Sequence, residues 1–270
     1  MRNKAENILA IVALGFCLNS CTTPSDKFSR QALDYNFQQQ PIDTPTFRHQ
    51  IFTNQAAEQY RKLNTLHVYL DGDGSPWINK RRLARDPTSR NPLILRLMQL
   101  DQSPSILLGR PCYHGLNKAL VCQPKYWTSH RYSLQVVESM ALALNLWLKD
   151  KDYKQVILIG YSGGGVLAML IAKQVAKLKA VVTVAANLNV SEWSRYHGYS
   201  PLYDSLNPAE RAKDFYFHQL HIAGADDTVV PAYIIEQFAN KQSNAEYLLL
   251  ADQDHRCCWA QVWPEILELF

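Results

Sequence analysis

The sequence has no excess of charge of either sign and no internal repeat. Among 270 residues, 28 are Lys or Arg and 24 are Asp or Glu, which gives a net charge of +4. Nucleic-acid binding needs clustered positive charge, so this near balance argues against it. The rest of the composition, 47% hydrophobic and 19% charged residues, is typical of one globular domain with a large core.

Metal-ligand spacings are also missing. The chain has six cysteines and eight histidines, but it contains no Cys-x-x-Cys and no His-x-x-x-His pattern. Structural and catalytic zinc sites commonly use such spacings. The sequence therefore predicts neither a bound metal nor an organic cofactor.

The N-terminal apolar run is too short to cross a membrane. Residues 1–20 join a positive start, with Arg2 and Lys4, to an apolar stretch from Ile8 to Leu18, which is typical of a signal peptide. The segment Leu18-Asn19-Ser20-Cys21 resembles a bacterial lipobox. That resemblance implies a lipid on Cys21 and an envelope protein anchored to a membrane and facing the periplasm, with ordinary secretion as the alternative.

Residues 21–44 are polar and contain two prolines and three consecutive glutamines. This composition predicts a tether between the anchor and a domain that covers residues 45–270.

Four cysteines remain after Cys17 leaves with the signal peptide and Cys21 takes lipid. Cys112 and Cys122 flank a short loop, so a disulfide between them is the simplest pairing in an oxidising compartment. The adjacent Cys257 and Cys258 could form a bridge with each other, stay reduced or, with less support, bind metal.

Short apolar runs alternate with helical patterns along the domain. The predicted strands cover residues 46–53, 66–70, 105–108, 156–159, 180–186, 220–223 and 246–250, and helices are expected near 92–101, 133–148, 166–178, 232–240 and 259–269. This alternation predicts an α/β fold, with a mostly parallel sheet and helices on both faces. Function in such sheets lies at the carboxyl ends of the strands.

A glycine-rich turn follows one of these strands. Residues Gly160-Tyr161-Ser162-Gly163-Gly164 match Gly-x-Ser-x-Gly between a strand and a helix. Small neighbours allow a strained turn that exposes the serine hydroxyl, and the Gly163 amide lies at the helix N-terminus, where it can face negative charge. Ser162 is therefore the candidate nucleophile.

A serine nucleophile needs a base, and the base needs an acid that orients it. His255 follows the last predicted strand, and Asp226 and Asp227 follow the strand before it. These residues are the candidate base and the two candidate acids.

An oxyanion hole needs a second amide besides that of Gly163. The turn after residues 66–70 contains Gly72, which permits close approach, and Asp73, whose amide is the expected donor. The carboxylates of Asp71 and Asp73 are expected to brace Arg81, Arg82 or Arg110, with contact to a cationic substrate group as the alternative.

Several segments resemble a known superfamily. The sequences LDGDGSPW, RDPTSRNP, GRPC, YWTS, GYSGGG, HGYSPL, SLNP and DHRCCW are similar to those of bacterial envelope serine hydrolases of unassigned substrate within the α/β-hydrolase superfamily. Over residues 65–268, the resemblance implies an α/β-hydrolase fold with a small lid-like excursion at 187–214. It also implies a triad of Ser162, His255 and Asp227, because Gly224, Asp227, Val230 and Pro231 match the turn that carries the acid in that superfamily.

The implied reaction is hydrolysis of a carboxylic ester, either a small acyl ester or a lipid, with membrane contact through Cys21. The alternatives are a peptidase or an acyltransferase that uses the same triad, and a non-catalytic envelope scaffold.

Overall fold

The computed structural model describes residues 22–59, 64–79, 81–211 and 215–270. The predicted signal peptide and Cys21 lie outside the described residues. None of the described helices is both long and apolar enough to span a bilayer.

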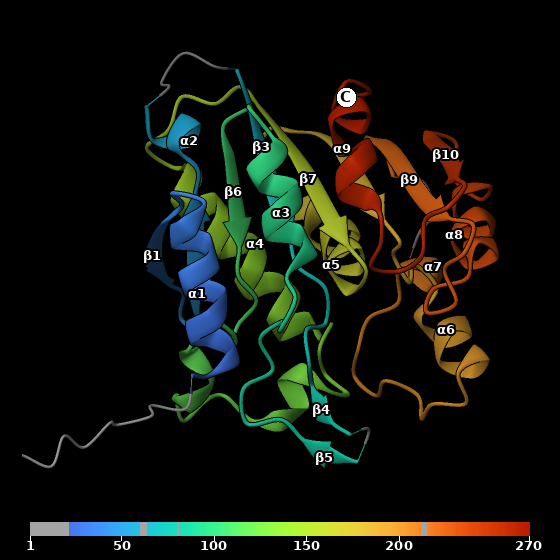
Figure 1. Cartoon of the computed structure of the whole chain (residues 1–270), viewed down its shortest axis with the longest axis horizontal. Helices are drawn as coiled ribbons and strands as arrows, with labels where there is room; N and C mark the ends of the chain where they lie inside the picture. The colour runs from blue at the N-terminus through green and yellow to red at the C-terminus, as the bar shows by residue number, and fades with distance from the viewer. Residues whose placement is uncertain (1–21, 60–63, 80, 212–214) are drawn as a thin grey trace, which may run out of the picture.

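The fold is built on an eight-stranded sheet (Figure 1). Its spatial order is β1 (Gln38–Asp43), β2 (Arg48–Thr53), β6 (Ser105–Leu108), β3 (Thr65–Leu70), β7 (Gln155–Tyr161), β8 (Leu178–Val184), β9 (His218–Gly224) and β10 (Ala245–Leu250). In this spatial order β6, β3, β7, β8, β9 and β10 run parallel to one another. At one edge, β1 and β2 are added as antiparallel strands. The parallel strands therefore end at one common edge of the sheet.

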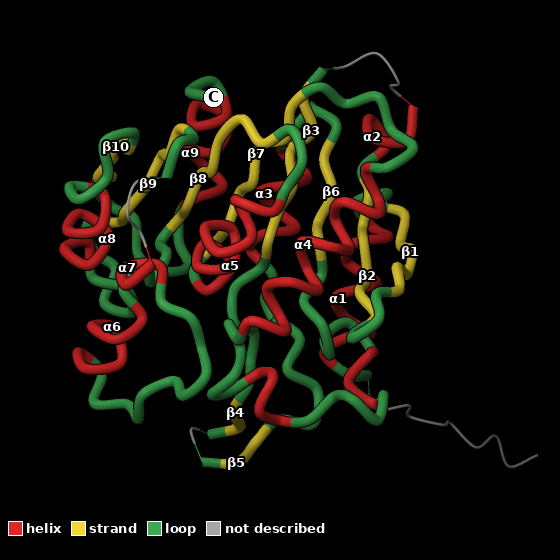
Figure 2. Tube along the Cα trace, turned by 180° about the vertical axis from the view of Figure 1, so that it is seen from behind, coloured by secondary structure: helices red, strands yellow, loops and turns green. Residues whose placement is uncertain are grey.

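Helices cover both faces of the sheet. In Figure 1, α1 (Pro24–Asp34), α3 (Leu93–Leu100) and α9 (Trp259–Leu267) lie in front of it. The opposite view in Figure 2 shows α4 (Leu134–Leu148), α5 (Gly163–Ile171) and α8 (Ala232–Ala239). The shorter elements are α2 (Gln55–Gln59), β4 (Trp77–Ile78), β5 (Arg82–Leu83), α6 (Val190–Tyr196) and α7 (Pro208–Arg211), with short 3-10 turns between them. The predicted three-layer fold class is confirmed.

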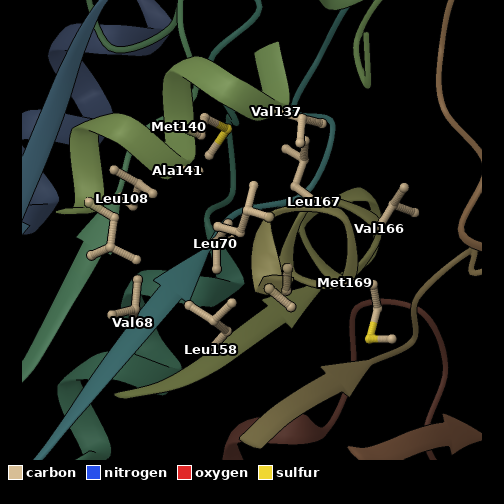
Figure 3. Packing of buried hydrophobic residues seen from close by; sticks show 14 of the residues in the cluster. Val68, Leu70, Leu108, Val137, Met140, Ala141, Leu158, Val166, Leu167 and Met169 are labelled. Carbon is tan, nitrogen blue, oxygen red and sulfur yellow. The ribbon is translucent and has the colours of Figure 1, made fainter. Parts of the chain in front are cut away.

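Alternate strand residues belong to two separate cores. On β7, Val156 and Leu158 join the core under α4 and α5, while Ile157 and Ile159 join the core under α1, α3 and α9. This alternation is the two-residue period of a strand that is buried on both faces. Figure 3 shows the first of these cores, where Leu158 and Leu70 from the sheet lie beside Leu167 of α5.

The polar tether predicted over 21–44 is wrong for residues 24–43, which fold onto the domain. Thr23 caps α1 through a reciprocal capping box with Asp26, and β1 pairs with β2 in the main sheet. Phe28 and Ala32, four residues apart on α1, are each only 1% exposed. Their burial explains why a helix forms in so polar a segment.

The excursion expected at 187–214 contains α6 and α7 in its described part. Helix α6 is attached to the loop after β9, because Trp193 Nε1 donates a hydrogen bond of 2.8 Å to the carbonyl oxygen of Val229. Figure 1 shows α6 at the edge where the parallel strands end.

Phe28 should contribute strongly to stability, since the centroid of its ring lies 5.3 Å from the ring centroid of Phe52 and 4.4 Å from that of His114. We expect Phe28→Ala to lower the free energy of unfolding by about 3–5 kcal/mol, because it leaves a cavity under the sheet. Denaturant titration measures this loss. Leu33→Ala is the control on the same helix, since Leu33 is 64% exposed and should change stability by less than about 0.5 kcal/mol. Equal effects of the two substitutions would contradict the docking of α1.

Candidate active site

Ser162 lies in a strained turn between β7 and α5. Its φ is +52° and its ψ is −126°, a conformation that non-glycine residues rarely adopt. The surrounding structure holds it there, since the Ser162 amide donates 2.8 Å to the carbonyl of Val184 and the Ser162 carbonyl accepts from Gly165. The turn exposes part of the Ser162 side chain above the sheet edge.

Glycine is required on both sides of this turn. A Cβ on Gly160 would lie 2.4 Å from the carbonyl oxygen of Gly164, and one on Gly164 would lie 2.1 Å from that of Leu70. These distances are too short for any side chain. The glycines of the motif therefore let α5 begin directly against β7 and β3.

A continuous chain of hydrogen bonds joins the three residues predicted as a triad. His255 Nε2 lies 3.1 Å from Ser162 Oγ, and His255 Nδ1 lies 2.8 Å from Asp227 Oδ2. Ser162 follows β7, Asp227 follows β9 and His255 follows β10. The common carboxyl edge of the parallel strands therefore brings the three residues together.

Asp227 is the acid that contacts His255. Its side chain is fully buried, and its second oxygen, Oδ1, accepts from the amides of Val229 and Val230 at 2.8 Å each. These two amides hold the carboxylate in place beside His255. Asp226, the second candidate acid, is exposed.

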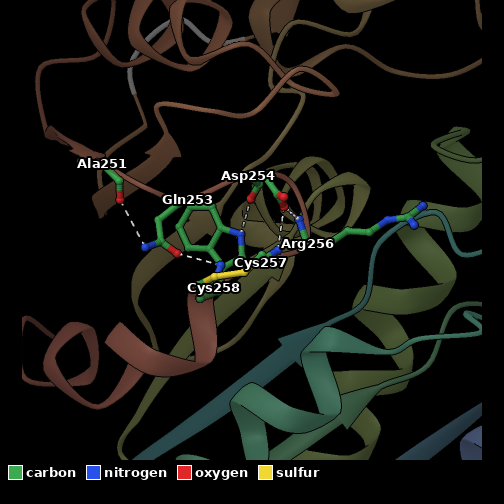
Figure 4. Close-up of a disulfide and its surroundings, with 7 residues drawn as sticks. Ala251, Gln253, Asp254, Arg256, Cys257 and Cys258 are labelled. Atoms are coloured by element: carbon green, nitrogen blue, oxygen red, sulfur yellow. Dashed lines mark hydrogen bonds between the residues drawn. A yellow bond between two sulfur atoms is a disulfide. The ribbon is translucent and has the colours of Figure 1, made fainter.

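The loop that carries His255 is held by its own side chains (Figure 4). Asp254 Oδ1 accepts from the amides of Arg256 at 2.6 Å and Cys257 at 2.7 Å, and Gln253 Oε1 accepts from the Cys258 amide at 2.9 Å. Tyr161 adds a contact from β7, since its hydroxyl donates 2.6 Å to the His255 carbonyl. The imidazole therefore sits on a rigid turn.

Both cysteine pairs are disulfides. Cys112 and Cys122 are joined with Cα atoms 5.3 Å apart, which confirms the predicted pairing. Cys257 and Cys258 are joined to each other, so the bridged alternative holds for this pair. Among the described residues, no group of three or more His, Cys, Asp or Glu side chains could hold a metal ion.

The loop after β3 lies directly against Ser162. A Cβ on Gly72 would be 3.3 Å from the Ser162 Cβ. The Gly72 amide donates 2.8 Å to Asp71 Oδ1, whereas the amides of Asp73 and Gly163 donate to no acceptor among the described residues. Within the described part of the chain, the latter two amides therefore keep their hydrogen-bond donors unused.

The Asp73 carboxylate is bound by two buried arginines and a tyrosine. Arg110 donates 2.7 Å to Oδ1, Arg131 donates 2.6 Å to Oδ2, and the Tyr132 hydroxyl lies 2.8 Å from both oxygens. Burial alone would raise the pKa of Asp73, but Arg131 and Arg110 outweigh it and hold the pKa well below its usual range. The carboxylate is therefore ionised and fully paired.

This pairing matches the sequence prediction only in part. Arg110 was among the expected partners of Asp73, whereas Arg131 and Tyr132 were not. Arg131 and Tyr132 lie far from Asp73 in the sequence, and no sequence motif marks them as its partners. Among the arginines that the structure describes, none is braced by Asp71. Its Oδ1 accepts from the Gly72 amide, and burial raises its pKa to about 7.

Comparison with known families gives one match. The model of the family described as Serine hydrolase (FSH1) matches residues 122–257, a segment that contains Ser162, Asp227 and His255. No curated protein sequence matches the chain.

Solved structures of the same fold have little sequence identity with this chain. Est1E from Butyrivibrio proteoclasticus has a TM-score of 0.62 at 13% identity and covers 86% of this chain and 96% of its own. The Pyrococcus furiosus esterase Pf2001 gives 0.59 at 15%, with 88% and 90% covered. An alpha-beta serine hydrolase homologue from Coxiella burnetii gives 0.56 at 15%, with 86% and 94% covered. These similarities show an α/β-hydrolase fold.

Stability should fall as pH rises through the range set by Asp71. Its carboxyl ionises near 3.8 in the unfolded chain and near 7 when folded, so between these values the folded state holds the extra proton. We expect Asp71→Asn, which keeps an oxygen for the Gly72 amide, to remove this loss and to raise the free energy of unfolding at pH 8 by on the order of 4 kcal/mol.

Denaturant titrations from pH 4 to pH 8 measure the effect, with Asp226→Asn as the control at an exposed carboxylate. Identical pH profiles for wild type and Asp71→Asn would show that Asp71 is ionised in the fold.

Proposed function

The chain belongs to the serine hydrolase (FSH1) family, and from this premise we propose that it hydrolyses a carboxylic ester through Ser162, His255 and Asp227. The unbroken contact from Asp227 through His255 to Ser162 is the observation that carries the proposal. A serine hydroxyl is a weak nucleophile until a base accepts its proton, and this contact supplies the base.

The first half of the proposed reaction acylates Ser162. With Nδ1–H donated to Asp227, the Nε2 lone pair of His255 accepts the Ser162 proton as the oxygen attacks the ester carbonyl. Buried Asp227 selects this tautomer and stabilises the imidazolium that forms. The free amides of Gly163 and Asp73 would bind the tetrahedral oxyanion.

The second half releases the product. His255 returns its proton to the leaving alcohol, which departs and leaves an acyl group on Ser162. Water then enters, His255 removes one of its protons, and attack on the acyl-enzyme frees the carboxylic acid and restores Ser162. Every proton transfer uses the side chains already in contact, so the cycle requires no cofactor.

The Pyrococcus furiosus structure of the same fold, Pf2001, supports an ester over an amide, because it is named as an esterase. A panel of acyl esters against peptidyl amides tests this choice. Faster turnover of the amides would replace the proposal with a peptidase, and acyl transfer to an added alcohol in place of water would replace it with an acyltransferase.

Ser162→Ala should abolish covalent labelling by a fluorophosphonate and lower kcat by roughly 10⁵-fold or more, since no other group can form the acyl-enzyme. Gel fluorescence and ester turnover measure the two effects. Ser200→Ala, at an exposed serine of the 187–214 excursion, is the control and should keep full labelling. Labelling that persists in Ser162→Ala, or that is absent in the folded wild type, would contradict the proposal.

We also propose that Cys21 carries lipid and anchors the protein to a membrane of a bacterial envelope, with the domain facing the periplasm. The support is the lipobox-like segment that precedes it. Metabolic labelling with an alkyne fatty acid should mark the wild type and not Cys21→Ser. Cys17→Ser is the matched control and should keep the label. Absence of label from the wild type would leave secretion without an anchor as the alternative, and equal label on Cys21→Ser would place the lipid on another residue.

A further inference from the structure

We propose that Arg110 is the positioning residue of the oxyanion hole, because it holds the peptide unit between Gly72 and Asp73 so that the Asp73 amide is directed at the substrate. This inference rests on the proposed function of Ser162. Arg110 acts through that peptide, to which it donates a hydrogen bond.

One nitrogen of Arg110 holds two points of this loop. Nη1 donates to the Gly72 carbonyl oxygen at 3.0 Å and to Asp73 Oδ1 at 2.7 Å. The Gly72 carbonyl and the Asp73 amide belong to the same planar peptide unit. In a trans peptide the two groups point in opposite directions, so a cation that binds the carbonyl turns the amide away from itself.

The loop that Arg110 holds also borders the nucleophile. Gly72 lies against Ser162, and the Asp73 amide has no acceptor among the described residues. Tyr113 holds the next carbonyl in the same way, since its hydroxyl donates 3.0 Å to the Asp73 carbonyl oxygen. The loop is therefore fixed through two consecutive carbonyl groups, while the Asp73 amide between them keeps its donor free of any acceptor in the described part of the chain.

Arg110 can also strengthen that donor. A guanidinium bound to the carbonyl oxygen draws electron density from the peptide and makes its N–H more acidic. Arg110 is 1% exposed, so water does not compete for this contact. A donor that is held in this way needs no rearrangement during the reaction.

Arg131 provides a matched comparison for Arg110. It is buried to a similar degree, at 7% exposed, and donates to the other oxygen of the Asp73 carboxylate. The Arg131 side chain donates to Asp73 and to the Thr128 carbonyl and not to Gly72, while the Arg131 carbonyl oxygen accepts 3.2 Å from Arg110 Nη2. Removing either arginine takes one positive charge from Asp73, but only the loss of Arg110 frees the Gly72 carbonyl.

The first measurement compares Arg110→Met with Arg131→Met in the full-length protein on a soluble aryl acetate. We expect kcat to fall roughly 10- to 100-fold in Arg110→Met and less than about threefold in Arg131→Met. KM should change less than about twofold in both, because the oxyanion forms only after binding. Thermal unfolding midpoints show whether the two variants are equally folded.

The second measurement does not depend on activity. The nitrogen shift of an amide responds to hydrogen bonding at the carbonyl of its own peptide unit. In protein labelled with [15N]aspartate, the Asp73 nitrogen resonance should move in Arg110→Met and stay near its wild-type position in Arg131→Met. If Arg110→Met does not fold, Arg110→Lys and Arg131→Lys replace the pair, since a lysine cannot reproduce the geometry of the guanidinium.

Equal losses of kcat in the two folded variants would overturn the inference, because Arg110 would then act only by neutralising Asp73. An unmoved Asp73 resonance in the Arg110 variant would also overturn it. A wild type that neither cleaves esters nor reacts with a fluorophosphonate would refute the proposed function, while the resonance would still report whether Arg110 holds the peptide.

Discussion

The ion pair network around Asp73 is the interaction on which the geometry of the site depends. One carboxylate is shared by two buried guanidinium groups and a tyrosine hydroxyl. These partners all lie in the connection between β6 and α4, with Arg110 at its start and Arg131 near its end. Removal of Asp73 would leave two buried guanidinium groups without their partner, and breaking a buried ion pair in this way typically costs about 3–5 kcal/mol. The network therefore ties the loop beside Ser162 to both ends of this connection.

This network also allows an acidic residue to lie beside an oxyanion site. An isolated carboxylate next to a developing negative charge would oppose the reaction. Here two positive charges meet one negative charge, so the cluster has a net positive charge. A Cβ on Gly163 would lie 2.1 Å from Asp73 Oδ1 and 2.5 Å from the Tyr132 hydroxyl. The glycine after the nucleophile is thus required by the network as well as by the turn.

Much of the fold could be predicted from the sequence, because its information is local. Doubly buried strands such as Val156–Ile159 are continuous apolar runs, and the turn around Ser162 is a motif of adjacent residues. The candidate site followed from chain order, since residues after parallel strands must meet at one edge.

Two features were missed for different reasons. The segment 24–43 was misjudged because its overall polarity concealed a local signal, namely the capping residues Thr23 and Asp26 and the apolar pair Phe28 and Ala32. The contact of Arg131 with Asp73 joins residues 58 positions apart through irregular loops. No periodicity or spacing predicts such a contact, because it depends on how the loops pack.

The start of α1 has a consequence for how the protein would meet a membrane. Ser25 donates its amide to Asp86 and binds Thr88 and the Gly115 amide through its hydroxyl, so the chain is fixed from its fourth residue after Cys21. The four residue steps from Cys21 to Ser25 span at most about 14 Å. A lipid on Cys21 would therefore keep the start of α1 close to the membrane surface. Figure 1 shows α1 starting at the edge where the parallel strands end. The active site would then face the membrane surface and meet substrates that diffuse laterally in the membrane near that edge of the sheet.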